Sequence, residues 1–188
     1  MRALVLIFAV LLALPGAAGA QSGAPSGGSA GGAADRSDAT RSARISVGGE
    51  TGLPIPRFVT LRAREVNVRT GPGVRYPIDW VFQRPNLPVE VVAEFDTWRK
   101  IRDFEGTEGW VHQSMLSGRR TVIVVTAVRM LRREPAESAP PMARLEPGVI
   151  AWLEACQSDW CEVEVAGIDG WLRRGDVWGV RAGDPAEN

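Results

Sequence analysis

The sequence has little of what most catalytic and metal sites are built from. Its 188 residues include one histidine, His112, and two cysteines. Acid–base and nucleophilic catalysis usually need an imidazole or thiol beside a second reactive group, and zinc usually takes about four ligands of these kinds. We therefore expect no enzymatic activity, no metal site and no other cofactor.

An excess of charge of one sign is also missing. The chain carries 22 basic and 22 acidic side chains, so its formal net charge is zero at pH 7. Nucleic-acid-binding domains usually carry a basic excess that neutralises phosphates. The balance predicts no nucleic-acid partner, and we expect the arginine doublets, such as Arg132-Arg133 and Arg173-Arg174, to pair with neighbouring carboxylates.

Long hydrophobic runs are confined to the N-terminus. Residues 3–14 are all apolar, follow Met1-Arg2 and precede the small-residue pattern Ala18-Gly19-Ala20. Twelve apolar residues fall short of the roughly twenty that span a bilayer, whereas this arrangement is typical of a secretory signal peptide. We predict a signal peptide over residues 1–20. The product is then exported, periplasmic or extracellular, with no stable membrane insertion after cleavage.

The next segment is poor in aromatic and large apolar residues. Residues 21–56 consist largely of glycine, alanine, serine and threonine and contain no aromatic side chain. Such a stretch cannot bury enough apolar surface to offset the entropy lost on ordering. We predict a flexible linker over residues 21–56.

The rest of the chain contains an internal repeat. Trp98-Arg99-Lys100-Ile101 returns as Trp160-Cys161-Glu162-Val163 at an offset of 62, and Gly109-Trp110-Val111 returns as Gly170-Trp171-Leu172 at an offset of 61. Earlier, Val68-Arg69 returns as Leu131-Arg132 at an offset of 63. The order of the matches is kept and the offset drifts only between them, as expected of a duplication with loop deletions. We predict two domains, a first copy over residues 57–118 and a second over residues 121–181.

Each copy has the residue alternation of β-strands. One strand face is apolar in both copies, and the two copies match position by position. A turn and a second short apolar run follow in each copy, which predicts a central β-hairpin, and no segment after residue 20 has a helical period. The fold class is therefore all-β, with about five strands per copy forming a small bent barrel that is closed or nearly so. The predicted core faces are Leu87, Val89, Val91 and Ala93 in the first copy, and Val149, Ala151, Leu153 and Ala155 in the second.

The two cysteines, Cys156 and Cys161, lie on either side of the hairpin turn in the second copy. Opposed strand residues bring their Cβ atoms close enough for a disulfide, and an exported chain meets an oxidising compartment. A redox pair would favour a two-residue spacing at a helix start, and a metal site would need further ligands. We predict a structural disulfide, with Glu94 and Arg99 as a weak ion pair at the matching positions of the first copy.

The aromatic residues supply the candidate ligand contacts. Four tryptophans repeat between the copies, and repeated aromatics usually pack in the core or at a barrel rim. Tyr76 and Trp80 have no aromatic counterpart and lie in a predicted long loop after Gly73, which makes this loop the favoured ligand-facing surface. Trp152 aligns with Glu90, opposite the core face, and is predicted to be exposed or pressed against the other copy. The candidate ligand-binding residues are Tyr76, Trp80, Trp98 and Trp152, whereas His112 is expected to be an ordinary solvent-facing strand residue.

Three segments of the first copy carry a family resemblance. Residues 65–72, Trp98-Arg99-Lys100-Ile101 and residues 107–112 closely resemble the bacterial SH3-like domain family found in envelope proteins. The second copy differs at Met130 and Glu134, where the first has Asn67 and Gly71. The resemblance covers about residues 58–181 and implies tandem SH3-like β-barrels, commonly cell-wall or peptide-binding modules beside a hydrolase or amidase.

Export, loop aromatics and this resemblance together predict a non-catalytic binding module. The expected partner is peptidoglycan or its peptide stems, bound through stacking on Tyr76 and Trp80. The alternative is a module that binds an envelope protein through an apolar patch of Trp152 and Trp178, without affinity for the cell wall.

Overall fold

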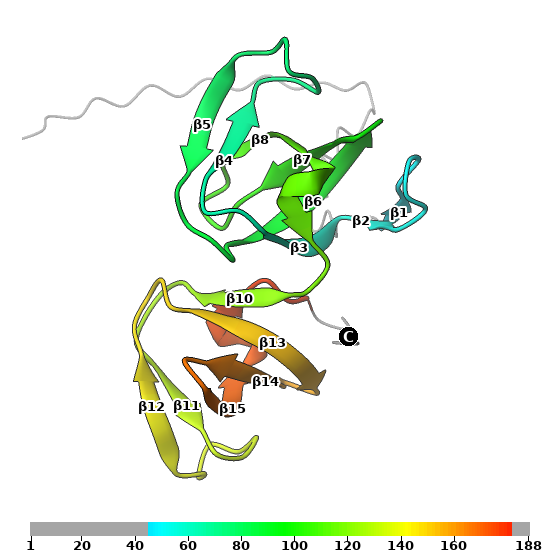
Figure 1. The fold of residues 1–188 in the computed structure, drawn as a ribbon. Helices are drawn as coiled ribbons and strands as arrows, with labels where there is room; N and C mark the ends of the chain where they lie inside the picture. The colour runs from blue at the N-terminus through cyan, green and yellow to red at the C-terminus, as the bar shows by residue number, and fades with distance from the viewer. Residues whose placement is uncertain (1–44, 182–188) are drawn as a thin grey trace, which may run out of the picture. The chain divides into compact units, whose positions relative to one another are not determined.

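The computed structural model describes residues 45–181, so the predicted signal peptide and residues 21–44 of the predicted linker lie outside the described part. Strands dominate residues 45–181, where the only helical elements are two 3-10 turns, η1 (Gln113–Met115) and η2 (Arg174–Asp176) (Figure 1). No helix in this part is long and apolar enough to cross a membrane. The predicted all-β class is confirmed.

Two seven-stranded antiparallel sheets repeat the same strand order. The first runs β5-β4-β8-β7-β6-β3-β9 and the second runs β12-β11-β15-β14-β13-β10-β16, so each strand has its equivalent in the other sheet (Figure 1). The first sheet consists of β3 (Arg57–Leu61), β4 (Val66–Arg69), β5 (Ile78–Phe82), β6 (Pro88–Phe95), β7 (Trp98–Arg102), β8 (Glu108–His112) and β9 (Leu116–Ser117). The second consists of β10 (Thr121–Val124), β11 (Arg129–Arg132), β12 (Pro141–Leu145), β13 (Ile150–Gln157), β14 (Trp160–Val165), β15 (Ile168–Arg173) and β16 (Val177–Trp178).

The sheets differ from the prediction in strand number, since each has seven strands rather than about five. The barrels were predicted to be closed or nearly so. Within residues 45–181, β5 and β9 remain at the two edges of the first sheet and β12 and β16 at those of the second. The duplication itself and the bent antiparallel architecture are as predicted.

Most residues of the two predicted core faces are buried. Leu87, Val89 and Val91 are buried in the first sheet, and Ala151 and Leu153 are buried in the second. The pairing register shifts between Val91 and Ala93, and at the equivalent point between Leu153 and Ala155. A β-bulge at this point bends the strand. Ala93 and Ala155 beyond it are consequently only half-buried.

The repeated Gly-Trp pair marks a close approach of two strands. A Cβ at Gly109 would lie 2.2 Å from Cγ1 of Val68, and a Cβ at Gly170 would lie 2.6 Å from Cγ of Leu131. Both neighbours are fully buried core residues of β4 and β11. Only glycine leaves room for them, which explains why the sequence repeats it.

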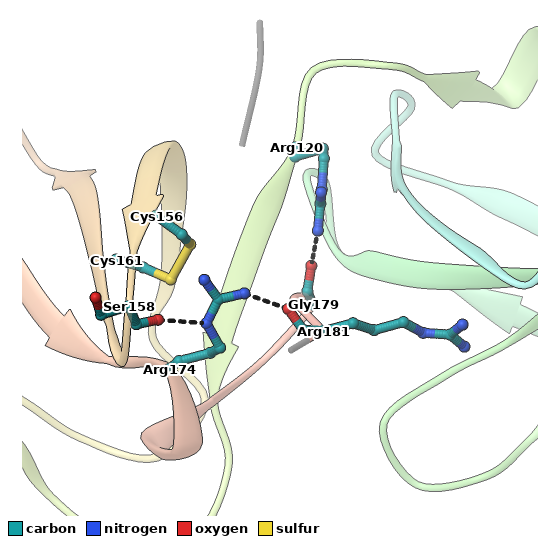
Figure 2. The surroundings of a disulfide bond; sticks show 7 residues. All are labelled: Arg120, Cys156, Ser158, Cys161, Arg174, Gly179 and Arg181. Carbon is teal, nitrogen blue, oxygen red and sulfur yellow. Dashed lines mark hydrogen bonds between the residues drawn. A yellow bond between two sulfur atoms is a disulfide. The ribbon is translucent and has the colours of Figure 1, made fainter. Parts of the chain in front are cut away.

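The central hairpin of the second sheet carries the predicted disulfide. Cys156 on β13 and Cys161 on β14 are directly paired, with Cα atoms 4.0 Å apart, and they are bonded (Figure 2). The hairpin turn next to them is held by Arg174, whose Nε donates to the Ser158 carbonyl at 3.1 Å. The structural disulfide is confirmed.

In the equivalent hairpin of the first sheet, an ion pair takes the place of the disulfide. Glu94 on β6 pairs in register with Arg99 on β7, and the two side chains, 1% and 4% exposed, approach to 3.6 Å. The predicted ion pair is present, and both of its side chains are buried. A third group makes the burial possible: Arg57 donates from Nη2 to Glu94 Oε1 at 2.8 Å.

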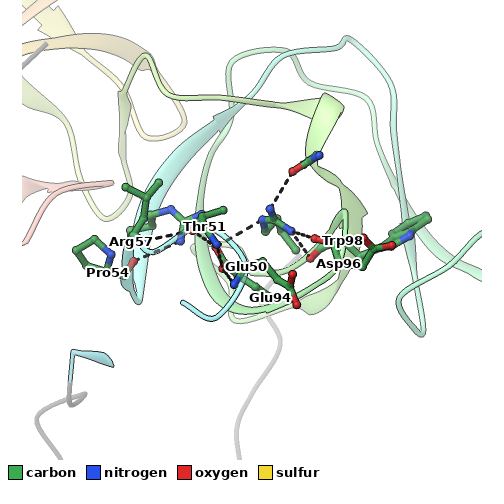
Figure 3. A network of polar contacts seen from close by, with 10 residues as sticks. Glu50, Thr51, Pro54, Arg57, Glu94, Asp96 and Trp98 are labelled. Atoms are coloured by element: carbon green, nitrogen blue, oxygen red, sulfur yellow. Dashed lines mark hydrogen bonds and ion pairs between the residues drawn. The ribbon is translucent and has the colours of Figure 1, made fainter. Parts of the chain in front are cut away.

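The last part of the predicted linker is an ordered hairpin. Residues 45–56 contain β1 (Ser46–Val47) and β2 (Pro54–Ile55), which pair antiparallel, and Ile55 is buried. The hairpin turn docks on Glu94: the Thr51 hydroxyl donates to Oε1 at 2.6 Å, and the backbone N–H groups of Glu50 and Thr51 donate to Oε2 (Figure 3). The linker prediction was therefore wrong for residues 45–56. Local composition does not show a turn that is ordered by a carboxylate over 40 residues away in sequence.

The two sheets contact each other through apolar and hydroxyl groups. Ile123 of β10 is fully buried in the core of the first sheet. The Trp178 ring lies edge-to-face on Phe58, with centroids 4.8 Å apart. The Thr60 and Thr121 hydroxyls are hydrogen-bonded at 3.0 Å. Trp178 is thus packed against the first sheet and does not belong to the exposed patch predicted for a protein partner.

Candidate ligand-binding site

A hollow of about 350 Å³ opens beside strands β4, β7 and β8 of the first sheet. A hollow of about 270 Å³ opens at the equivalent place in the second sheet. Volumes of this size accommodate a small ligand or one or two residues of a peptide. The first is lined by Glu65, Asn67, Arg69, Val74, Trp98, His112 and Met115, and the second by Val128, Arg129, Met130, Arg132, Glu137, Trp160, Arg173 and Asp176.

The two hollows are the same site in duplicate. All seven lining positions of the first recur in the second, at offsets that fall from 63 to 61 along the chain as the repeat predicts. Arginine and tryptophan are kept, whereas the other positions change. The pairs are Glu65 and Val128, Asn67 and Met130, Arg69 and Arg132, Val74 and Glu137, Trp98 and Trp160, His112 and Arg173, and Met115 and Asp176.

Arg69 is held in place by the backbone. Its Nη1 donates to the carbonyls of Tyr76 at 2.7 Å and Val74 at 3.2 Å, both in the loop between β4 and β5. Within residues 45–181, no hydrogen bond or ion pair is made by its second terminal nitrogen, Nη2. The guanidinium is therefore oriented, and one of its N–H-bearing faces remains available to a ligand.

His112 and Trp98 form the aromatic side of this hollow. They are paired across β7 and β8, and their rings meet edge-to-face with centroids 5.6 Å apart. Nδ1 of His112 accepts from the backbone N–H of Ser114 at 3.3 Å, which caps η1. The same nitrogen lies 2.7 Å from the Ser114 hydroxyl. With Nδ1 engaged by Ser114, Nε2 is the ring nitrogen that can meet a ligand beside the indole.

The second hollow repeats this arrangement with an acid added. Arg132 donates from Nη1 to the Ala139 carbonyl at 2.8 Å, the position equivalent to Tyr76, and from Nη2 to Glu137 at 3.1 Å. Arg173 lies over the Trp160 ring, 5.0 Å from its centroid, at the position where His112 meets Trp98 edge-on in the first hollow. Its Nε donates to the same carboxylate. The hydrogen bond from Arg173 lowers the pKa of Glu137 and raises the pKa of Arg173 itself. The predicted carboxylate pairing is found for one arginine of each doublet, Arg132 and Arg173, whereas Arg174 donates to backbone carbonyls.

The structure does not bring the four predicted ligand residues together. Trp98 lines the first hollow, but Tyr76 contributes only its carbonyl, since its ring packs over Gly71. Trp80 lines a different hollow, with Phe82 and Phe104.

Trp80 also lies in an element other than the one predicted. Ile78, Asp79 and Trp80 form part of strand β5, not of the predicted loop, because this strand pairs antiparallel with β4. Trp152 on β13 lies half-buried under the Arg119 guanidinium, 3.9 Å from the ring centroid.

Sequence reasoning missed Asn67, Arg69 and His112 as members of the site. His112 was expected to be an ordinary solvent-facing residue, but it is half-buried against Trp98. A signal was present: positions 112 and 173 both carry an N–H donor opposite a repeated tryptophan. Alignment of the copies alone could not show that β4 brings an arginine to the same place.

The repeated sheet and its repeated hollow define a duplicated small all-β domain. The bacterial SH3 domain family matches the chain twice, over residues 62–118 and 126–179. These matches cover more than half of the sequence, and the chain belongs to the bacterial SH3 domain family. The family resemblance seen in the sequence is thereby confirmed.

Two solved structures are similar to parts of the chain. NlpC2 from Trichomonas vaginalis is 10% identical with a TM-score of 0.31, and the match covers 65% of this chain and 48% of that one. NlpC1 from the same organism is 9% identical with a TM-score of 0.31, and the match covers 70% and 48%. This chain thus spans about half the length of either structure. No curated protein matches the chain.

Proposed function

We propose that this protein is a non-catalytic, exported binding module that attaches to the bacterial cell wall, with peptidoglycan or its peptide stems as ligand. The observation that carries the proposal is the hollow of the first sheet, where Arg69, Trp98 and His112 converge. Membership of the bacterial SH3 domain family supports a binding role, and the disulfide fits an exported protein.

The chemistry of the hollow suits a peptide more than a sugar polymer alone. The Trp98 ring offers an apolar face for a methyl group or a peptide plane. Asn67, exposed at the rim, can both donate to and accept from a peptide group, and Arg69 and His112 add donors for carbonyl or carboxylate oxygens. Oriented donors around an aromatic platform are typical of sites that select a short peptide.

The proposal is tested by co-sedimentation of the oxidised protein with purified peptidoglycan over a salt series. We expect pelleting that resists salt, because stacking and hydrogen bonds are screened less than a purely ionic contact. Asn67→Ala and Arg69→Gln are expected to reduce pelleting, whereas Trp80→Ala, outside the hollow, serves as the matched control. Pelleting no greater than that of an unrelated protein would overturn the proposal.

A second candidate is an envelope protein-interaction module without cell-wall affinity. The edge strand β5 favours it, because Ile78, Trp80 and Val81 on this strand are 47%, 55% and 37% exposed. An apolar sheet edge is a template for an added strand from another chain. Trp80→Ala would then be the damaging variant, and a monomer that cross-links to nothing in the envelope would exclude this candidate.

A further inference from the structure

The second hollow holds an acidic side chain that the first hollow lacks. Glu137 occupies the loop position of Val74, and its carboxylate receives hydrogen bonds from Arg132 Nη2 and Arg173 Nε. Glu137 is 56% exposed, so burial does not force it into this place. Two converging charged donors hold the carboxylate over the Trp160 side of the hollow.

The first hollow has the same receptor, and no side chain of residues 45–181 is bonded to it as Glu137 is bonded in the second. Arg69 is anchored through the Tyr76 carbonyl as Arg132 is through that of Ala139, and its Nη2 corresponds to the atom that holds Glu137. Val74, 79% exposed, offers no acid. Glu65 also lines the hollow, but among residues 45–181 it forms no ion pair with Arg69.

We infer that the first hollow binds the free carboxylate of a peptide, and that Glu137 is a built-in copy of that ligand group which closes the second hollow. The inference rests on the proposed binding role of the first hollow and names the group it recognises. The source we favour is the carboxyl end of a cell-wall peptide stem, because the protein is proposed to be exported to the wall.

The same geometry explains why only one of the two copies should bind. An acid on a neighbouring loop acts at an effective concentration in the millimolar range or above, so a free peptide carboxylate competes poorly with it. In the first copy Glu65 lines the hollow, but among the described residues it makes no ion pair with Arg69 and so does not occupy the place that Glu137 takes in the second. The duplication thus yields one receptive and one self-occupied site.

A reciprocal exchange of the two loop residues tests the inference. The probe is N-acetyl-D-alanyl-D-alanine, with its C-terminal amide as control, titrated into the oxidised protein while the indole N–H signals of Trp98 and Trp160 and the ring signals of His112 are followed by NMR. In the unaltered protein we expect the acid to shift Trp98 and His112 but not Trp160, and the amide to shift none of them.

The two variants should exchange these responses. Val74→Glu is expected to weaken the Trp98 response at least about tenfold, and Glu137→Val to create a response at Trp160. Both positions are exposed, so the fold should be retained, and Val74→Gln and Glu137→Gln separate charge from shape. An undiminished Trp98 response in Val74→Glu, or an equal response to acid and amide, would overturn the inference.

The outcomes also separate this inference from the proposed function. Peptidoglycan pelleting without any response to the dipeptide acid would leave the wall proposal standing and end the carboxylate inference. A response to the dipeptide acid without pelleting would support carboxylate recognition and overturn the proposed attachment to the wall. An equal response to the L,L-dipeptide acid would support carboxylate recognition and move its source to the C-terminus of a protein.

Discussion

A single buried carboxylate, Glu94, organises the N-terminal part of the described structure. Burial by itself would raise its pKa, but hydrogen bonds from the Thr51 hydroxyl, the Arg57 guanidinium and the Thr51 backbone, together with the charge of Arg57, outweigh it. The pKa of Glu94 is consequently lowered from 4.5 to about 2. The Glu94 carboxylate, which accepts hydrogen bonds from several donors, stabilises the fold only while it is ionised.

Glu94→Gln should therefore destabilise the protein in a pH-dependent way. Because the folded-state pKa lies below the unfolded one, the contribution of Glu94 is complete above about pH 4.5 and is lost as the pH falls toward 2. We expect the free energy of unfolding at pH 7 to fall by about 2 kcal/mol, the usual cost of losing hydrogen bonds to a charged group. Urea denaturation at pH 7 and at pH 3 measures the difference, which should shrink at the lower pH.

Glu108→Gln is the matched control for this experiment. Glu108 pairs with Lys100 on the surface, both side chains being more than a third exposed, and such pairs contribute about 0–1 kcal/mol. If Glu94→Gln and Glu108→Gln had equal effects, or if the effect of Glu94→Gln did not change with pH, the stabilising role of Glu94 would be refuted.

At the scale of elements, the two copies close the same hairpin by different means. The strand pair β13–β14 is joined by the Cys156–Cys161 disulfide, and the pair β6–β7 by Glu94 with Arg99. The covalent bond acts within its own hairpin. The ionic pair also recruits Arg57 and the β1–β2 turn, so it connects a further element to the sheet.

Removal of the disulfide by Cys156→Ser with Cys161→Ser should cost about 2 kcal/mol. The bond closes a loop of only the six residues 156–161, and in the chain-entropy model the constraint on the unfolded state grows slowly with loop length. Denaturation of the oxidised protein, the reduced protein and the double variant measures this. Reductant should lower the stability of the parent to that of the variant, and an effect of reductant on the variant itself would contradict the assignment.

At the scale of the whole described chain, the second sheet completes the core of the first. Ile123 from β10 and Trp178 from β16 pack against the first core, although both strands belong to the second sheet. The Thr121 hydroxyl also bonds the Asn86 carbonyl at 2.8 Å. The two copies are thus coupled through contacts that each would lack alone.

Trp178→Ala should uncouple the unfolding of the two copies. The half-buried ring contacts Phe58 and Phe104, and its loss should lower stability by about 2 kcal/mol, less than the 3–5 kcal/mol typical of a fully buried aromatic. We expect coincident unfolding transitions by fluorescence and circular dichroism in the parent and separated ones in the variant. Trp80→Ala, which removes an exposed ring, should leave the transitions coincident. Coincident transitions of unchanged midpoint in Trp178→Ala would contradict the coupling.

Much of this molecule was predictable because it is local or repeated. Alternation at Leu87, Val89 and Val91 predicts a strand with one buried face, and the paired offsets predict two copies of one fold. The cysteines were assigned correctly because the hairpin register follows from the turn between them. The hairpin of residues 45–56 was missed because its order depends on Glu94, far away in sequence.

The fold class, the duplication and the disulfide could be derived from the amino-acid sequence, since these follow from short-range periodicity and from matches along the chain. The location of the candidate site could not, because Arg69, Trp98 and His112 come from three different strands that meet only in the folded protein. The same holds for the difference between the hollows, where Glu137 is bonded to two arginines and Val74 offers no acid. The side chains of each hollow are brought together by antiparallel strand pairing and by the closure of loops. The spacing of residues along the sequence predicts neither the pairing of distant strands nor the path of the loops.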